Sequence, residues 1–143
     1  MKTSINFKAV ATLALIIVLS TNCSKNSSSD NGSLSSIVTS GQWHVSLFSE
    51  HGNNETSDFN NYNFTFLSDG TLMAEKGSSM VHGTWSENSS SKKLIINLGP
   101  KQDSNKPLGE LTDDWEIVAT SGTKISLTDD NSSRDELLEF TRH

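Results

Sequence analysis

Apolar and polar residues alternate with a period of two along most of the chain after residue 41. This alternation is typical of β-strands that bury one face. Short runs rich in Gly, Ser, Asn and Asp separate the alternating segments, and these residues favour turns. The pattern predicts eight strands, at residues 42–49, 62–67, 71–76, 80–87, 93–98, 115–120, 124–128 and 136–142.

The first predicted strand illustrates how the buried face is assigned. A period of two places Trp43, Val45 and Leu47 on the inner face and Phe48 on the other. A different signal comes from Gly83, which interrupts the strand at 80–87. A glycine inside a strand indicates a bend or a close approach of two backbones.

Two segments outside the strands carry their own signals. Residues 33–39 predict a short helix, with Ser33 as its cap and Gly41 just beyond its end. Residues 107–111 predict a single helical turn, whose Leu108 and Leu111 cover one end of the core.

Eight sequential strands joined by short polar connections favour pairing between neighbours in the chain. Eight is also about the number at which an antiparallel meander closes into a barrel. We therefore predict an all-β, eight-stranded antiparallel up-and-down barrel with a short N-terminal helix. An open sandwich made of the same strands is the alternative.

The N-terminal region has the zones of an export signal. Lys2 and Lys8 precede an apolar run at residues 9–19, which is short for a membrane span but typical of a signal peptide. Cys23 follows, and then a Ser/Asn-rich segment whose composition favours a flexible tether. We predict a signal peptide at 1–22, a modified cysteine and tether at 23–32, and one folded domain at 33–143.

This leader resembles a bacterial lipoprotein signal, in which the cysteine becomes the lipid-modified first residue of the mature protein. The resemblance implies anchoring in the cell envelope through Cys23, and Ser24 after the cysteine favours the outer membrane, with its face left open. Lipoprotein signals usually have Leu three places before the cysteine and Gly, Ala or Ser directly before it. Here Ser20 and Asn22 stand in those places, and Leu19 is one position early. This departure resembles the looser signals of the Bacteroidetes. A plain secretory signal or an uncleaved anchor is the alternative.

The start of the domain resembles that of the lipocalins, which belong to the calycins. In lipocalins a short helical turn precedes Gly-x-Trp, and a basic residue of the last strand covers the Trp. Gly41, Trp43 and Arg142 stand in the corresponding places, so the resemblance implies that they close the barrel. Small lipocalin-like lipoproteins of Bacteroidetes also resemble this chain in Gly83-Thr84-Trp85 and Leu138-Glu139-Phe140. The middle lipocalin motif, a Thr-Asp-Tyr-like turn, is not evident.

The charge balance narrows the range of partners. Lys and Arg number 11 against 17 Asp and Glu, a formal net charge of −6, and loss of Lys2 and Lys8 with the leader makes it −8. An acidic domain without a basic patch is not expected to bind nucleic acid. With one cysteine the chain forms no internal disulfide, and its oligomeric state is left open.

The sequence contains no recognisable catalytic or metal-binding pattern. The histidines, His44, His51, His82 and His143, lack metal-ligand spacing, and no serine lies in a Gly-x-Ser-x-Gly elbow. Asp113 and Asp114, with Glu110 nearby, lack the pattern of a calcium loop, and Asp129-Asp130-Asn131 indicates a turn. We therefore predict no enzyme, no metal and no cofactor.

The aromatic residues leave two functional interpretations open. In the first, the barrel holds a small apolar ligand in a cavity lined by some of Tyr62, Phe64, Phe66, Trp85, Trp115 and Phe140. In the second, the same rings fill the core, and the protein is a scaffold that binds another envelope protein through its loops. The two differ in whether side chains fill the barrel.

Overall fold

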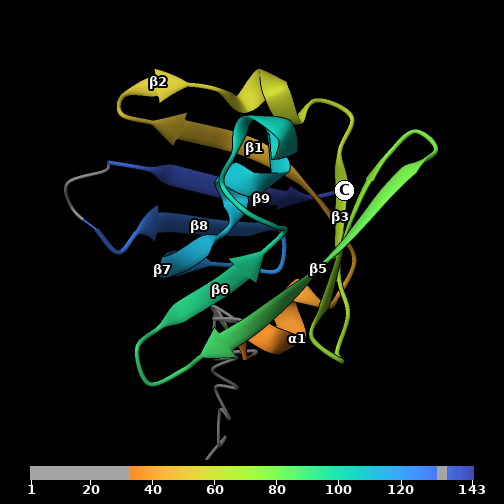
Figure 1. Cartoon of the computed structure of the whole chain (residues 1–143). Helices are drawn as coiled ribbons and strands as arrows, with labels where there is room; N and C mark the ends of the chain where they lie inside the picture. The colour runs from red at the N-terminus through yellow and green to blue at the C-terminus, as the bar shows by residue number, and fades with distance from the viewer. Residues whose placement is uncertain (1–32, 132–134) are drawn as a thin grey trace, which may run out of the picture.

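A computed structural model describes residues 33–131 and 135–143 of the chain. These residues form an antiparallel β-barrel (Figure 1). The predicted signal peptide and the tether with Cys23 lie outside the described residues. No helix among the described residues is long and apolar enough to cross a membrane.

Eight strands make up the barrel wall, and each of the eight predicted segments corresponds to one of them. Neighbours in the chain pair with one another from β3 to β9, and β1 pairs with both β3 and β9. A ninth strand, β2 (Asn53–Asn54), is two residues long and only extends the end of β1. The wall consists of β1 (Gln42–Glu50), β3 (Asn63–Phe66), β4 (Thr71–Lys76), β5 (Ser79–Asn88), β6 (Lys93–Asn97), β7 (Asp113–Thr120), β8 (Lys124–Asp129) and β9 (Leu137–Arg142).

Pairing between the first and last strands closes the barrel. β1 and β9 are antiparallel, with Trp43 opposite Arg142 at one end and Ser49 opposite Leu137 at the other. Because every strand of the wall has a neighbour on both sides, no full-length sheet edge is left to pair with another chain. The predicted all-β, eight-stranded antiparallel barrel is confirmed, and the open sandwich is not what forms.

A β-bulge in β1 corrects one predicted face. The register between β1 and β9 shifts between Val45 and Leu47, so the alternation changes phase at that point. Phe48 is therefore buried, 1% exposed, whereas Leu47 is only half-buried. Strict alternation had placed these two residues the other way round, because a bulge leaves no sign in a period-two pattern.

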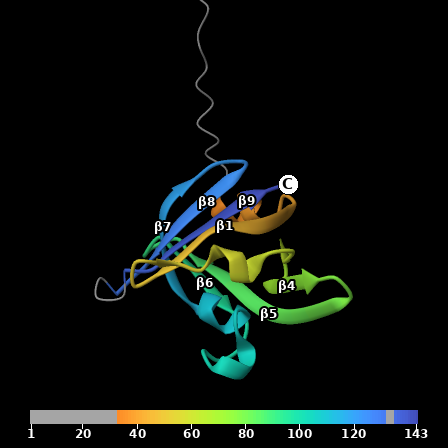
Figure 2. The ribbon, with the colours of Figure 1, turned by 90° about the horizontal axis from the view of Figure 1, so that it is seen from above.

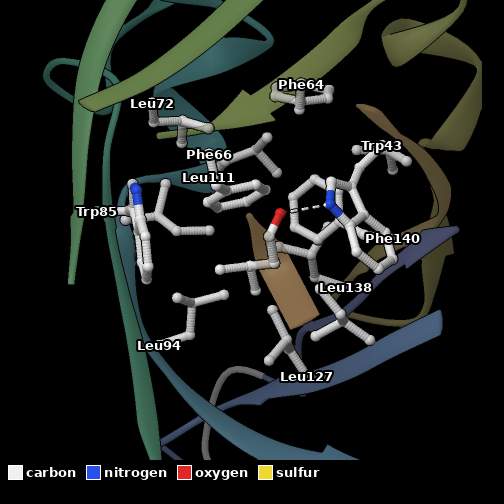
Figure 3. Packing of buried hydrophobic residues seen from close by; sticks show 14 of the residues in the cluster. Trp43, Phe64, Phe66, Leu72, Trp85, Leu94, Leu111, Leu127, Leu138 and Phe140 are labelled. Carbon is white, nitrogen blue, oxygen red and sulfur yellow. Dashed lines mark hydrogen bonds between the residues drawn. The ribbon is translucent and has the colours of Figure 1, made fainter. Parts of the chain in front are cut away.

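The inward faces of the strands meet in one continuous hydrophobic core. The rings of Phe64 and Phe140 lie 5.5 Å apart between centroids, and those of Phe66 and Phe140 lie 5.7 Å apart, both edge to face. Leucines from several strands pack around these rings, as Figure 3 shows for Leu94, Leu127 and Leu138. At these positions the barrel interior is filled by side chains.

The short helix α1 (Leu34–Val38) covers one end of the barrel (Figure 1). The Ser33 hydroxyl accepts a hydrogen bond from the Ser36 N–H, which caps the helix as predicted. The Trp43 Nε1–H donates to the Val38 carbonyl at 2.7 Å and joins the end of the helix to β1. The Glu87 carboxylate accepts from the N–H and the hydroxyl of Ser35, which joins the helix to β5.

Three 3₁₀ turns lie in the loops, namely η1 (Thr56–Phe59), η2 (Asp103–Asn105) and η3 (Leu108–Leu111). Leu108 and Leu111 of η3 are buried against the core, as the sequence predicts. Seen from above, the segment that contains η2 and η3 extends outward from the wall near β5 and β6 (Figure 2). Phe59 of η1 packs edge to face on Phe48 at 5.2 Å.

The close backbone approach that Gly83 indicates is present. A Cβ atom at Gly83 would lie 2.2 Å from the Asn97 carbonyl oxygen of the neighbouring strand β6. Backbone atoms of a paired strand move only if the strand pair moves. A side chain at this position is therefore incompatible with the register of β5 and β6.

We expect Gly83→Ala to lower the free energy of unfolding by about 3 kcal/mol through overpacking. Gly41→Ala is the matched control, because its Cβ would meet the flexible Arg142 side chain at 3.0 Å and should cost less than about 1 kcal/mol. Urea denaturation followed by circular dichroism measures both. Equal losses in the two variants would contradict the role assigned to Gly83.

Candidate functional site

The barrel wall has a gap between β1 and β3. These strands pair only at Gln42–Thr65 and Trp43–Phe64, whereas β1 pairs with β9 at six positions. Farther along β1, the Phe48 N–H donates to the Thr56 hydroxyl at 2.9 Å instead of to a strand. The chain between β2 and β3 thus takes the place of a neighbouring strand.

A surface cleft of about 340 Å³ lies at this gap, and we call it the seam cleft. Val45, Phe59 and the ring of Tyr62 supply its apolar surface, and the remaining residues supply amides and imidazoles. Asp, Glu, Lys and Arg are absent from its lining. The seam cleft is lined by His44, Val45, Phe59, Asn60, Asn61, Tyr62, Asn63 and His143.

Two histidines, one on β1 and one just after β9, meet on one side of the seam cleft. The imidazole centroids of His44 and His143 lie 4.6 Å apart, with the rings tilted by 40°. Burial lowers the pKa of His44 below its ordinary value of 6.5, and the neighbouring His143 lowers it further. The Nδ1 atom of His44 is buried and has no hydrogen-bond partner among the described residues.

His143 also bridges the gap between β1 and β3. Its Nε2 atom lies 3.1 Å from the Asn63 side-chain oxygen of β3, within hydrogen-bond distance. Its backbone N–H donates to the Gln42 carbonyl, at 3.3 Å. One residue after β9 thus contacts both strands that border the seam cleft.

The opposite wall of the seam cleft is a short loop that holds its own shape. The Asn60 N–H donates to the Ser57 carbonyl and the Tyr62 N–H to the Phe59 carbonyl, at 3.2 and 3.1 Å. Asn61 has a φ of +66°, in the left-handed region that Asn tolerates better than most residues. Beside this wall, the Lys76 ammonium lies 4.6 Å from the centroid of the Tyr62 ring.

The six aromatic residues proposed as a cavity lining lie in two places. Tyr62 is half-buried and lines the seam cleft. The other five are buried side chains of the barrel core. Among them, the Trp85 Nε1–H donates to the Leu67 carbonyl and the Trp115 Nε1–H donates to the Leu111 carbonyl. An apolar cavity lined by these rings stays a prediction.

The residues suggested as closing the barrel lie together at its α1 end. Trp43 is fully buried and stands opposite Arg142 in the β1–β9 register. The Arg142 side chain passes Gly41, where a Cβ would lie 3.0 Å from its Cδ atom. The Arg142 Nη1 donates to the Ser40 hydroxyl at 2.6 Å. The arginine thus ties the last strand to the segment that precedes β1.

Acidic residues form a second cluster, which the sequence pattern did not reveal. Carboxylate oxygens of Asp113, Asp129 and Asp130 lie within 4.8 Å of one another. Lys101 pairs with Asp113 at 2.7 Å, and Lys93 pairs with Asp130. These lysines offset the carboxylate charge, so the arrangement is that of an ion-pair network.

Glu136 lies beside this network and is 2% exposed. Burial raises the pKa of the Glu136 carboxyl, and the Lys101 ammonium 3.6 Å away acts in the opposite direction. Glu110, which the sequence placed near Asp113, instead pairs with Lys106 at 3.5 Å.

Comparison with known proteins supports the fold alone. A crystal structure of a DUF4847 family protein from Bacteroides vulgatus ATCC 8482 is similar to this chain, with a TM-score of 0.57 and 18% identical residues. The match covers 78% of this chain and 98% of that one. No protein-family model and no curated protein matches the sequence.

The lowered pKa of His44 allows a test of its burial at the seam cleft. As the pH falls below about 6.5, the unfolded chain binds the proton more readily than the folded one, so stability falls until the pH passes below the folded pKa. We expect the free energy of unfolding to drop more between pH 7.5 and 5.5 in the wild type than in His44→Gln.

His82→Gln is the control, because His82 is exposed on β5 and away from the seam cleft. Urea denaturation at both pH values measures the difference. A pH dependence that is the same in His44→Gln and His82→Gln would contradict the burial assigned to His44.

Proposed function

We propose that this protein is a lipid-anchored, non-enzymatic envelope protein that binds a small ligand in the seam cleft. The observation that carries the proposal is the gap between β1 and β3, which opens a concave site about 340 Å³ in volume. Ligand sites of proteins commonly occupy about 300–1,000 Å³ and combine apolar surface with a few polar groups. The seam cleft has both properties.

A binding role suits the chemistry of this site better than catalysis does. His44 and His143 supply two imidazoles, and no Ser, Cys, Asp or Glu side chain lines the seam cleft beside them. Nucleophilic catalysis requires a nucleophile within hydrogen-bond reach of a base. The lining has no Ser, Thr, Cys, Lys or carboxylate side chain to act as a nucleophile beside the imidazoles, which favours reversible binding.

The lipid anchor rests on the leader sequence. Cys23 follows the apolar run at residues 9–19 and precedes the polar tether. Two or more acyl chains on such a cysteine anchor a protein stably, since each buried CH₂ contributes about 0.8 kcal/mol. We place the anchored protein in the cell envelope, at the outer membrane.

Membership of a lipocalin-like branch of the calycins is part of the proposal. Its support is the short helix before Gly41 and Trp43, and Arg142 opposite Trp43 on the last strand. In that reading these residues serve the architecture of the barrel.

Packing of the interior supports a second candidate function, an envelope scaffold that binds another protein through its loops. Phe66 packs edge to face on both Trp85 and Phe140, each at 5.7 Å, and all three rings are buried. Rings that contact one another in this way leave no space for a ligand between them. Because of this packing, we propose the seam cleft as the ligand site in place of the barrel interior.

Replacing Cys23 tests the anchor. We expect Cys23→Ser to appear in the soluble fraction of the expressing bacterium, whereas the wild type stays with the membranes and takes up a radiolabelled fatty acid. Ser28→Ala, a change within the tether, is the control and should fractionate like the wild type. An unlabelled wild type, or a Cys23→Ser protein that stays on the membrane, would rule the anchor out.

The binding site is tested by NMR with the purified full chain and a library of small molecules. We expect binders to shift the ring signals of His44 and Tyr62 and to leave those of Phe66 and Phe140 in place. Asn60→Trp, which fills the seam cleft, should abolish the shifts, whereas Asn53→Trp on the exposed strand β2 should not. Binders that shift the interior rings would place the site inside the barrel.

A further inference from the structure

Three asparagines within four consecutive residues form one wall of the seam cleft: Asn60, Asn61 and Asn63. Each side-chain amide offers an acceptor oxygen and an NH₂ with two donors. Asn60 and Asn61 are exposed, and their side-chain amides form no hydrogen bond with the residues that the structure describes. This wall presents donors and acceptors side by side.

The facing strand adds a backbone donor and acceptor. Peptide groups of successive residues in a strand point to alternate edges, and the Gln42 carbonyl points to β9, where it accepts from the His143 N–H. Val45, three residues later, therefore directs its N–H and C=O to the opposite edge. That edge borders the seam cleft, which Val45 lines, beyond the last pair with β3.

This free edge is too short for a peptide to join as an additional strand. Strand addition uses the peptide groups of alternate residues along several positions. After Val45 the next group on that edge belongs to Phe48, whose N–H and C=O already bond to Thr56 and Glu55. One residue is available, which fits a small molecule.

The apolar part of the seam cleft consists of rings and one aliphatic side chain. The Tyr62 ring is half-buried, the tilted His44 and His143 rings lie 4.6 Å apart, and Val45 and Phe59 are buried. C–H groups on the face of a ligand ring pack well against such surfaces. Lys76, the cation beside Tyr62, is not among the lining residues.

The side chains that line the seam cleft disfavour charged ligands. No Asp, Glu, Lys or Arg side chain lines the seam cleft, and the lowered pKa keeps His44 neutral at pH 7. The net charge of −6 repels anions from the molecule as a whole. A cation would find no Asp or Glu side chain in the lining to pair with, so the site favours an uncharged ligand.

A hydroxyl group both donates and accepts, so a ring that carries several hydroxyls matches amides, imidazoles and a peptide edge at once. We propose that the seam cleft binds an uncharged polyhydroxylated ring compound, namely a mono- or disaccharide. This inference rests on the proposed binding function of the same site. A volume of about 340 Å³ at the lower end of ligand sites fits one or two sugar rings.

Chemical-shift titration by NMR on the full chain at pH 7.5 tests the ligand class. The panel contains glucose, galactose, N-acetylglucosamine, maltose and lactose, with glucuronate and glucosamine as charged analogues and octanoate as an apolar probe. We expect at least one neutral sugar to bind, with the shifted signals at His44 and Tyr62 and at least tenfold preference over its charged analogues.

Side-chain deletion then tests the amide wall, which is the wall of the seam cleft formed by Asn60, Asn61 and Asn63. Asn60→Ala and Asn61→Gly should each weaken that sugar at least fivefold, the glycine being chosen because it keeps the positive φ of position 61 without strain. Asn53→Ala, at an exposed asparagine outside the seam cleft, should leave the affinity unchanged.

The outcomes separate the two claims. If octanoate or a charged analogue shifts His44 and Tyr62 while neutral sugars do not, the sugar inference is overturned and binding in the seam cleft stands. If no probe shifts these signals, the sugar inference and the binding function both fail. Sugar binding that survives Asn60→Ala and Asn61→Gly would overturn the role of the amide wall.

Discussion

The pairing of β1 with β9 is the contact on which the rest of the structure depends. It joins residues about a hundred positions apart, such as Trp43 and Arg142, and so fixes the whole chain between them into a ring. Trp43 lies where β1 pairs with both of its neighbours, and its indole N–H also binds the end of α1. Long-range pairing of this kind is entropically costly to form. The buried rings and leucines along both strands offset that cost.

The β1–β9 pairing that closes the barrel and the gap between β1 and β3 are linked through the bulge in β1. The bulge in β1 keeps Phe48 buried after the register shift, and Phe48 then packs on Phe59 of η1. Thr56 and Glu55 bond to the Phe48 backbone in place of β3. The wall is thus continuous in packing while its strand ladder is interrupted, and the seam cleft lies at the interruption.

Much of this architecture follows from local patterns in the sequence. Period-two alternation located all eight strands of the wall, Gly83 indicated a close backbone approach, and Leu108 and Leu111 were assigned correctly to the core. Each of these signals depends on neighbours within a few residues. The exchange of Leu47 and Phe48 shows the limit, because a bulge depends on the partner strand.

The candidate site depends on contacts between distant segments, which such patterns do not contain. His44 and His143 are 99 positions apart, and alone they look like an outward polar residue on a strand and a polar residue just after the last strand. Asp113 likewise meets Asp129 and Asp130 only through the pairing of β7 with β8. The run of Asn60, Asn61 and Asn63 beside Tyr62 is a local feature that could have indicated the seam cleft, but the strand pattern made no use of it.

The loop that walls the seam cleft has a consequence for how this protein can change over evolution. The backbone N–H groups of Asn60 and Tyr62 donate to carbonyls within the loop, and neither residue belongs to a strand of the wall. Replacing the side chains at positions 60 and 61 therefore alters the chemistry of the opening without altering a strand register or the core. The chemistry of this opening can drift while the barrel keeps its stability, so relatives with the same fold are free to differ at the seam cleft.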